Sequence, residues 1–307
     1  MKKGKNRLLT KSERTSRKEK TVSFIILFLV CCVWMLPLLY MFGTSFKSEI
    51  DLQLHPELLF PSDWQEWTLD HYKEMLFQNG QVGNIVYWIL NSLWSTVASV
   101  ALTVILDLIT AYAVVFLKFR GKNFFMKFLL LWMAVPGVMG TAPSFALYAW
   151  IRNTFSITGG ASSYLYIYFW IIAPSISGIF NFLLMKGFFS SIPSDIIDSA
   201  QSDGAGNAKI FFKIVCPLAR STVMLIVLFT FTSCWNNFMW PQLLLSSEDL
   251  TWQTLTVVLI GYTGGSSWGA NGIAMATGIL AMIPIIIVFI ITQNKMIDGL
   301  ASTGIKG

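Results

Sequence analysis

One group of side chains in this sequence has the residue types that bind a polar ligand. It joins planar amides to an indole ring: Asn181, Trp235, Asn236 and Asn237. Amides can hydrogen-bond hydroxyl groups while an aromatic ring covers an apolar face, so the group fits a sugar-like ligand. The same residue types also have ordinary roles in membrane helices, because tryptophans anchor helix ends at the lipid interface and asparagines join neighbouring helices.

Asp107 is a further candidate, because it stands inside a long apolar segment. A carboxylate within a bilayer is costly and therefore often functional. Asp107 could contact ligand hydroxyls or relay protons, and it could equally be protonated or paired with Thr103, Thr110 or another subunit. We include it in the predicted substrate pathway with the amides and the indole.

Catalytic and metal-binding patterns are not found in the sequence. His55 and His71 are isolated, with no second ligand at metal spacing. The four cysteines are Cys31, Cys32, Cys216 and Cys234. Their scatter matches neither a disulfide framework nor a zinc site. The chain also lacks the Gly-x-x-x-x-Gly-Lys-Ser/Thr loop that cradles nucleotide phosphates. We therefore expect no catalytic residue, no metal, no cofactor and no ATP hydrolysis by this chain.

The elements that must position these side chains are membrane helices. Of 307 residues, 54% are hydrophobic and only 12% are charged, against about 25% charged in soluble domains. Six apolar segments reach the roughly 20 residues that a transmembrane helix needs: 22–42, 85–117, 124–149, 164–185, 223–245 and 272–292. Because such long, non-alternating runs are not barrel strands, we expect an all-α polytopic membrane protein with six transmembrane helices.

Basic residues predict the orientation of these spans. Segments on one side of the six spans hold nineteen of the 22 Lys and Arg residues, and the other side holds Lys47, Lys73 and Arg152. Short basic loops stay in the cytoplasm, so we expect both termini to be cytoplasmic and the protein to be a multi-pass component of the cell membrane. The net charge of +6 then reflects topology and indicates no nucleic-acid partner.

One domain is expected at 21–307, because no internal repeat is apparent. The tail at 1–20 is rich in Lys and Arg; we interpret it as a solvated tail, with attraction to anionic lipid as the alternative. The external stretch 43–84 should be rich in turns and end in a short amphipathic helix near 72–77.

The cytoplasmic loop 186–220 has more pattern than a connection between spans requires. Apolar residues recur at helical spacing in two stretches: Ile196, Ile197 and Ala200, then Ala208, Phe211, Phe212 and Val215. Ser194 is a plausible N-cap of the first helix. Gly204 between the two helices permits a sharp turn or the close approach of another chain. The pattern predicts a compact projection that binds a partner protein.

At this loop the chain resembles the membrane permease subunits of ABC importers. Their cytoplasmic signature appears here as Asp198-Ser199-Ala200, Asp203-Gly204-Ala205 and Ile214-Val215-Cys216-Pro217. Asp198 and Ser199 stand where the family usually has Glu and Ala. The run 235–241 and the C-terminal 298–307 are similar to the carbohydrate-uptake branch, in particular to its smaller, maltose-type second permease.

The resemblance implies a mechanism and a set of partners. In the family this loop inserts as a coupling helix into a groove of a cytoplasmic ATPase, so the implied ATPase-coupling residues are Asp198, Ser199, Ala200, Asp203, Gly204 and Ala205. Two such ATPase subunits, a homologous second permease and an extracytoplasmic solute-binding protein would complete the importer, surrounded by membrane lipid. The implied cargo is an oligosaccharide or related sugar.

Besides a membrane scaffold without transport, which the projecting loop disfavours, two other transport functions remain open at this point. One is an ABC importer of a different solute with the same loop. The other is an ion-coupled secondary transporter, which commonly has inverted repeats and several buried ionisable groups. A single intramembrane Asp and no visible repeat argue against the second reading.

Overall fold

The computed structural model describes residues 11–78, 81–82, 84–263 and 272–304. The start of the predicted basic tail and the last three residues of the C-terminal motif lie outside this range. Contacts within the chain form two compact units. The first reaches to Lys73 and includes the beginning of the last helix, up to Ile279; the second begins at Glu74 and includes that helix from Leu280 onward. Each unit is described by itself.

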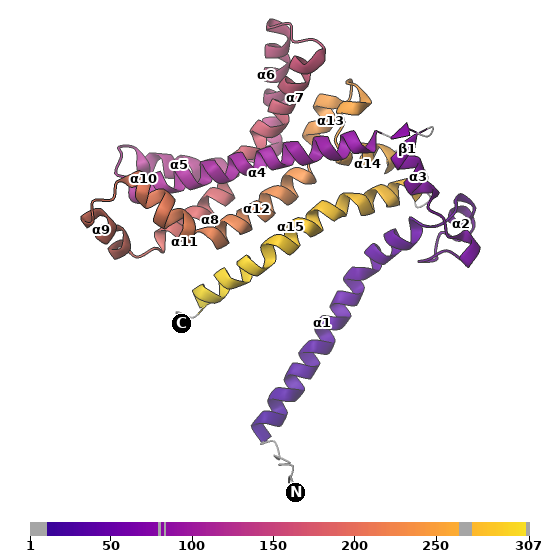
Figure 1. The fold of residues 1–307 in the computed structure, drawn as a ribbon, viewed down its shortest axis with the longest axis horizontal. Helices are drawn as coiled ribbons and strands as arrows, with labels where there is room; N and C mark the ends of the chain where they lie inside the picture. Colours follow the sequence, from indigo (N-terminus) through magenta and orange to yellow (C-terminus); the bar gives the residue numbers. More distant parts are fainter. Residues whose placement is uncertain (1–10, 79–80, 83, 264–271, 305–307) are drawn as a thin grey trace. The chain divides into compact units, whose positions relative to one another are not determined.

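Helices make up most of the described chain, which confirms the all-α expectation (Figure 1). In chain order the elements are α1 (Lys11–Thr44), α2 (Glu49–Leu54), η1 (Trp64–Glu66), α3 (Asp70–Leu76), β1 (Phe77–Gln78), β2 (Gln81–Val82), α4 (Ile85–Phe116), α5 (Lys122–Met133), η2 (Gly137–Gly140), α6 (Thr141–Thr154), α7 (Gly160–Ile172), η3 (Ala173–Ser177), α8 (Ile179–Ser190), α9 (Ser194–Ser202), α10 (Asn207–Ile210), η4 (Phe211–Val215), α11 (Cys216–Leu218), α12 (Arg220–Trp235), α13 (Met239–Leu245), η5 (Leu250–Trp252), α14 (Leu255–Thr263) and α15 (Gly272–Gly304). The strands β1 and β2 form one short antiparallel pair.

Membrane-length helices account for the six predicted spans in two ways. Within the described residues, three unbroken helices are long and apolar enough to cross a bilayer: Glu19–Thr44 of α1, all of α4, and Gly272–Met296 of α15. Three helix pairs pass the same test only when each is counted as one bent span: α5 with η2–α6, α7–η3 with α8, and the loop helices α10–α11 with α12. The described residues therefore give three spans, or up to six with these pairs. The first pair bends by 97° and the last by 72°.

Prolines lie at or near the breaks of the first two pairs. Pro136 separates α5 from η2, and Pro174 lies in the first turn of the 3₁₀ helix η3, which ends at Ser177, directly before Gly178. Proline has no backbone N–H and its ring clashes with the preceding turn, which favours a bend or a break. Helices α1 and α15 nonetheless continue through Pro37 and Pro284.

The predicted span 223–245 is likewise divided rather than continuous. Helix α12 ends at Trp235 and α13 begins at Met239. Pro241 lies in the first turn of α13, where a missing N–H costs nothing, but its ring would clash with the carbonyl of Asn237 in an unbroken helix. The chain therefore leaves helical geometry over residues 236–238 and places two asparagines in the break.

In the first unit, the segment after α1 folds around a buried lysine. Lys47 is fully buried, and its Nζ donates hydrogen bonds to the carbonyl oxygens of His55, at 2.7 Å, and Leu58, at 2.8 Å. The carbonyl of Lys47 pairs with Nε2 of His71 at 2.9 Å. The predicted short helix near 72–77 is present as α3.

In the second unit, α4 is the central element, and α8 and α12 run along it (Figure 1). One face of α4 is buried and carries small polar residues: Ser92, Ser95, Thr96, Ser99 and Thr103. Small side chains let helix backbones approach closely, which is how membrane helices gain packing energy without a hydrophobic driving force.

Asn91 ties the start of α4 to the η5 segment. Its Nδ2 donates to the carbonyls of Thr251, at 2.8 Å, and Gln253, at 3.1 Å, and its Oδ1 accepts from the Tyr164 hydroxyl at 2.6 Å. All three hydrogen bonds join segments far apart in the sequence. Because they form where water is scarce, losing them leaves buried polar groups unpaired.

We predict that Asn91→Leu destabilises the protein by at least about 2 kcal/mol, since each unpaired buried group costs about 1–3 kcal/mol. The measurement is thermal unfolding of the purified protein in detergent, with Asn153→Ala at an exposed site as the control. A melting temperature equal to that of the unmodified protein would contradict the structural role of Asn91.

Candidate functional site

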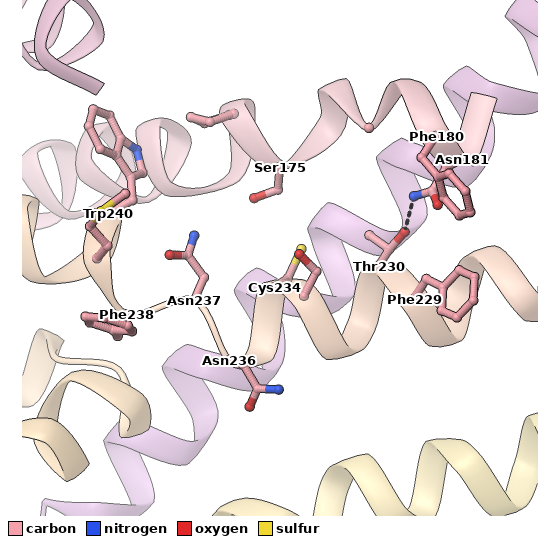
Figure 2. A pocket seen from close by; sticks show the side chains of 14 residues that line it. Ser175, Phe180, Asn181, Phe229, Thr230, Cys234, Asn236, Asn237, Phe238 and Trp240 are labelled. Carbon is pink, nitrogen blue, oxygen red and sulfur yellow. Dashed lines mark hydrogen bonds between the residues drawn. The ribbon is translucent and has the colours of Figure 1, made fainter. Parts of the chain in front are cut away.

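A cavity of about 820 Å³ lies between the η3–α8 turn and the α12–α13 break (Figure 2). Its polar lining side chains are Ser175, Asn181, Thr230, Ser233, Asn236 and Asn237. Its aromatic lining side chains are Phe180, Phe229, Phe238 and Trp240. We call it the first cavity. Three of the five predicted pathway residues, Asn181, Asn236 and Asn237, therefore lie together.

The amides of the first cavity are positioned by the helix breaks. Asn181 follows the Gly178 break, and its Nδ2 donates to Oγ1 of Thr230 at 2.9 Å, as the dashed line in Figure 2 shows. This bond uses one amide proton and leaves the amide oxygen to accept from a ligand. Figure 2 also shows that the amides of Asn236 and Asn237 point in different directions from the end of α12.

Aromatic rings complete the first cavity. Phe180 is 54% exposed and its ring centroid lies 6.0 Å from that of Phe229. Phe238 is also exposed, whereas Trp240 is buried and donates its Nε1–H to the carbonyl of Trp170. The cavity therefore combines a few polar groups with apolar rings, which is the general composition of small-molecule sites.

The other two predicted pathway residues lie elsewhere. Trp235 is 2% exposed; its ring stacks on Phe231 with centroids 5.7 Å apart, and its Nε1 donates to the carbonyl of Ala281 at 2.9 Å. Trp235 thus joins α12 to α15 and does not line the first cavity. Asp107 lines a separate cavity beside α5.

Sequence reasoning missed several lining residues. Thr230 and Ser233 are three residues apart on α12, the spacing that places side chains on one helix face. This periodicity could have identified them. Ser175 and Phe180 had no such signal, because their positions depend on the break at Gly178.

Helix α9 of the loop ends in a turn that requires glycine. The N–H of Gly204 donates to the carbonyl of Gln201 at 3.0 Å, and that of Ala205 donates to the carbonyl of Ala200 at 2.9 Å. This is a Schellman motif, with Gly204 in the left-handed region at φ +78°. A Cβ at Gly204 would meet no atom of the described residues within 4 Å, so backbone conformation rather than crowding requires glycine here.

The residues predicted to contact an ATPase divide into two sets. Asp198, Ser199, Asp203 and Gly204 are exposed on the loop. Ala200 and Ala205 are half-buried and pack against the protein interior. Four of the six are thus accessible to a partner protein, and the two alanines hold the turn in place.

Details of the first loop helix differ from the prediction. Ser194 is the first residue of α9 and Pro193 occupies the N-cap, where the carbonyl of Pro193 accepts from Ile196 N–H. Of the predicted apolar face, Ile197 is buried, whereas Ile196 is 42% exposed. Only one row of side chains on this short helix faces the protein interior, and Ile197 belongs to that row.

The second loop helix also departs from a regular α-helix. It comprises α10, the π-helical turn η4 and α11. Ile210 and Val215 are fully buried, while Phe212 is 70% exposed. The wider π turn rotates the following residues around the axis, so the predicted face of Ala208, Phe211, Phe212 and Val215 does not form as one surface.

The loop is fixed to the helices of the second unit by an apolar cluster, which we call the clamp core. It contains Ile197, Ile210 and Val215 of the loop, Met185 and Phe189 of α8, and Tyr112 of α4. The Tyr112 hydroxyl donates to the carbonyl of Asn207 at 3.1 Å, and its ring meets Phe211 edge-on at 5.1 Å. The loop therefore cannot move without displacing the ends of α4 and α8.

Comparison with known proteins assigns this architecture. Residues 108–297, which include the first cavity, the clamp core and the loop, match the family described as "Binding-protein-dependent transport system inner membrane component". The chain belongs to this family. It is a membrane permease of an ABC import system rather than an enzyme, as the resemblance of the loop predicted.

Individual permeases of this family resemble the chain over most of its length. The diacetylchitobiose uptake system permease protein DasC of Streptomyces coelicolor is 29% identical, over 88% of this chain and 91% of the relative. The galactooligosaccharides transport system permease protein GanQ of Bacillus subtilis is 29% identical, over 93% and 95%. A bacterial ABC transporter that imports the acidic polysaccharide alginate contains a chain with the same fold, with a TM-score of 0.72, 22% identity, and coverage of 94% and 98%.

We predict that weakening the clamp core makes the loop that contains α9 and α11 more accessible to solvent. Tyr112→Phe loses one hydrogen bond, worth about 1 kcal/mol, and should speed maleimide labelling of the half-buried Cys216 by up to about fivefold. Tyr112→Leu also loses the ring contacts and should have a larger effect.

The labelling rate is measured with Cys31, Cys32 and Cys234 replaced by serine. Tyr87→Phe, at an exposed position of α4, is the control. If both Tyr112 variants label at the unmodified rate, the tyrosine does not hold the loop.

Proposed function

We propose that the permease forms one half of the membrane pathway of an ATP-driven importer for oligosaccharides or related sugars. The composition of the first cavity supports a sugar cargo, because Asn181 and Asn237 can hydrogen-bond hydroxyls while Phe180 and Phe229 cover the apolar face of a sugar ring. The names of DasC and GanQ, which refer to oligosaccharide uptake, support the same class of cargo.

The loop containing α9 supplies the coupling to ATP. The observation that supports this proposal is an exposed surface of Asp198, Ser199 and Asp203 on a loop that the clamp core attaches to α4 and α8. We propose that this surface docks in a groove of a cytoplasmic ATPase. Closure of two such ATPases would then move the clamp core together with α4 and α8.

The remaining partners complete the assembly. A solute-binding protein belongs to the system by the definition of the family. We propose in addition a homologous second permease, which supplies the other half of the pathway. Both termini and the loop with α9 would face the cytoplasm, because nineteen of the 22 Lys and Arg residues lie in the segments on that side.

The helix breaks suit a pathway through which a sugar passes. Residues 236–238 are non-helical, and irregular backbone is tolerated at membrane depth only where it is buried in protein or lines an aqueous cavity. A few hydrogen bonds from side-chain amides would hold a sugar loosely enough to release it. We therefore assign ligand contact to Asn181, Asn236 and Asn237.

We predict that Gly204→Asp abolishes sugar uptake and co-purification of the ATPase, because a charged side chain would stand in the docked surface. Gly204→Ala and Gly204→Asn should both weaken co-purification. Asparagine tolerates positive φ better than alanine. Normal co-purification of the ATPase with Gly204→Asn but not with Gly204→Ala would mean that only the turn conformation requires glycine and that the ATPase does not contact this position.

Gly206→Asn provides the matched control, because Gly206 is exposed, has φ −71° and has open space around it. Uptake and membrane levels of each variant are measured in a strain that lacks the natural chain. Normal uptake by Gly204→Asp at a normal membrane level is incompatible with docking at this turn.

We predict that Asn181→Ala and Asn237→Ala each raise the KM for uptake of the labelled cargo by about three- to tenfold. The reason is the loss of a ligand hydrogen bond worth about 0.5–1.5 kcal/mol. ATPase co-purification should stay unchanged, because neither residue lies on the loop. Asn153→Ala is the control, and an unchanged KM in both variants removes the first cavity from the sugar pathway.

A further inference from the structure

A second cavity, of about 550 Å³, lies between α4, α5 and the η3–α8 turn. It adjoins the first cavity at Gly178, which lines both, and its other lining residues are different. Asn181 lines the first and the adjacent Phe182 lines the second, so the two cavities lie on different faces of α8. Nothing in the proposed sugar pathway uses the second cavity.

Asp107 supplies the charged group of the second cavity. The residue is 5% exposed, and its Oδ2 is buried with no hydrogen-bond partner among the described residues. Thr110 also lines the cavity, but its hydroxyl donates to the carbonyl of Leu106 at 2.6 Å. Thr103, one turn away on α4, is buried, and its hydroxyl also lacks a partner in the part of the chain that the structure describes. The Asp107 carboxylate could therefore accept a hydrogen bond from a donor or pair with a cation.

Aromatic rings form much of the cavity wall. Phe125, Phe128 and Trp132 of α5 and Phe182 of α8 all line it. Phe125 meets Phe182 in a T-shaped arrangement at 6.3 Å, and Phe128 stacks on Trp132 at 6.2 Å. The ring faces carry partial negative charge, which attracts cations held close to them.

The balance of polar and apolar groups decides which ligand fits. A sugar would bring several hydroxyl groups to a cavity that offers them one carboxylate, and each buried hydroxyl left unpaired costs about 1–3 kcal/mol. An anion would be repelled by Asp107. An organic ammonium ion needs one carboxylate for its charge and apolar, aromatic walls for the rest of the molecule.

We infer that the second cavity is a binding site for an alkylammonium group, held by the Asp107 carboxylate within the aromatic wall. The apolar chain of the ligand leaves the cavity beside Phe128 and Trp132, both of which are about half exposed on α5. An ion pair of this kind also removes the cost of a lone carboxylate inside a membrane span. The inference is independent of sugar transport.

Trp132 makes the site measurable. The permease is placed in nanodiscs of zwitterionic lipid and titrated with bromodecylammonium, whose bromine quenches a nearby indole. Bromodecanol, with the same chain and no charge, is the matched ligand. We expect saturable quenching by the ammonium that is lost in Trp132→Phe, and none that saturates with the alcohol.

Variants of the carboxylate test its role. Asp107→Asn should weaken the apparent affinity at least tenfold, Asp107→Glu should restore most of it, and Asp249→Asn, at a carboxylate outside this cavity, should leave it unchanged. Equal saturation by the alcohol, or full affinity in Asp107→Asn, would overturn the inference and leave an apolar cavity with a protonated acid. A rise in melting temperature with the ammonium in unmodified protein but not in Asp107→Asn is an independent readout.

The source of the ammonium group is found by repeating the titration on the complete importer. Binding there as well as in the isolated permease means that amines dissolved in the membrane reach the site. Binding to the isolated permease only means that a lysine of the second membrane subunit fills the site in the assembly. Absence of saturable binding in both samples refutes the site.

Discussion

The clamp core is the contact on which the proposed mechanism depends. A loop that binds an ATPase can move a membrane pathway only if it is attached to the pathway helices more firmly than to its surroundings. The loop buries Ile197, Ile210 and Val215 against α8 and α4. The hydrogen bond from the Tyr112 hydroxyl to the carbonyl of Asn207 also joins the loop to α4. Close-packed interiors are stiff, so displacement at α9 is transmitted to the helices rather than absorbed by the loop.

The broken helices have a complementary role. A straight membrane helix satisfies its own backbone and presents only side chains, whereas a break presents irregular backbone and polar side chains at the same depth. Asn236 and Asn237 lie in the α12–α13 break beside Pro241 and line the first cavity. Asn181 follows the break at Gly178 and lines the same cavity. The same chain thus combines stiff packing at the clamp core with polar, irregular structure where a ligand would pass.

The sequence predicts the helical class, the six spans and the loop, because hydrophobic length, basic-residue placement and the Gly204 turn are local signals. It does not predict which face of each helix is buried. Phe212 belongs to an apolar pattern and is nonetheless exposed, because the π turn η4 changes the register. Trp235 and Asp107 have residue types suited to the pathway but lie outside the first cavity, since the helix breaks and the packing of α12 against α15 depend on contacts distant in sequence.

Rigid attachment of the loop is tested most directly by a distance measured within the permease during the ATPase cycle. Spin labels at the exposed positions Gln201 in α9 and Arg120 in the turn between α4 and α5 report the separation of the loop from the cytoplasmic end of α4. We expect the same narrow distance distribution in the nucleotide-free and ATP-trapped importer, because the clamp core moves as one body. A distance that shifts or broadens on ATP binding, while sugar uptake remains normal, would contradict this mechanism.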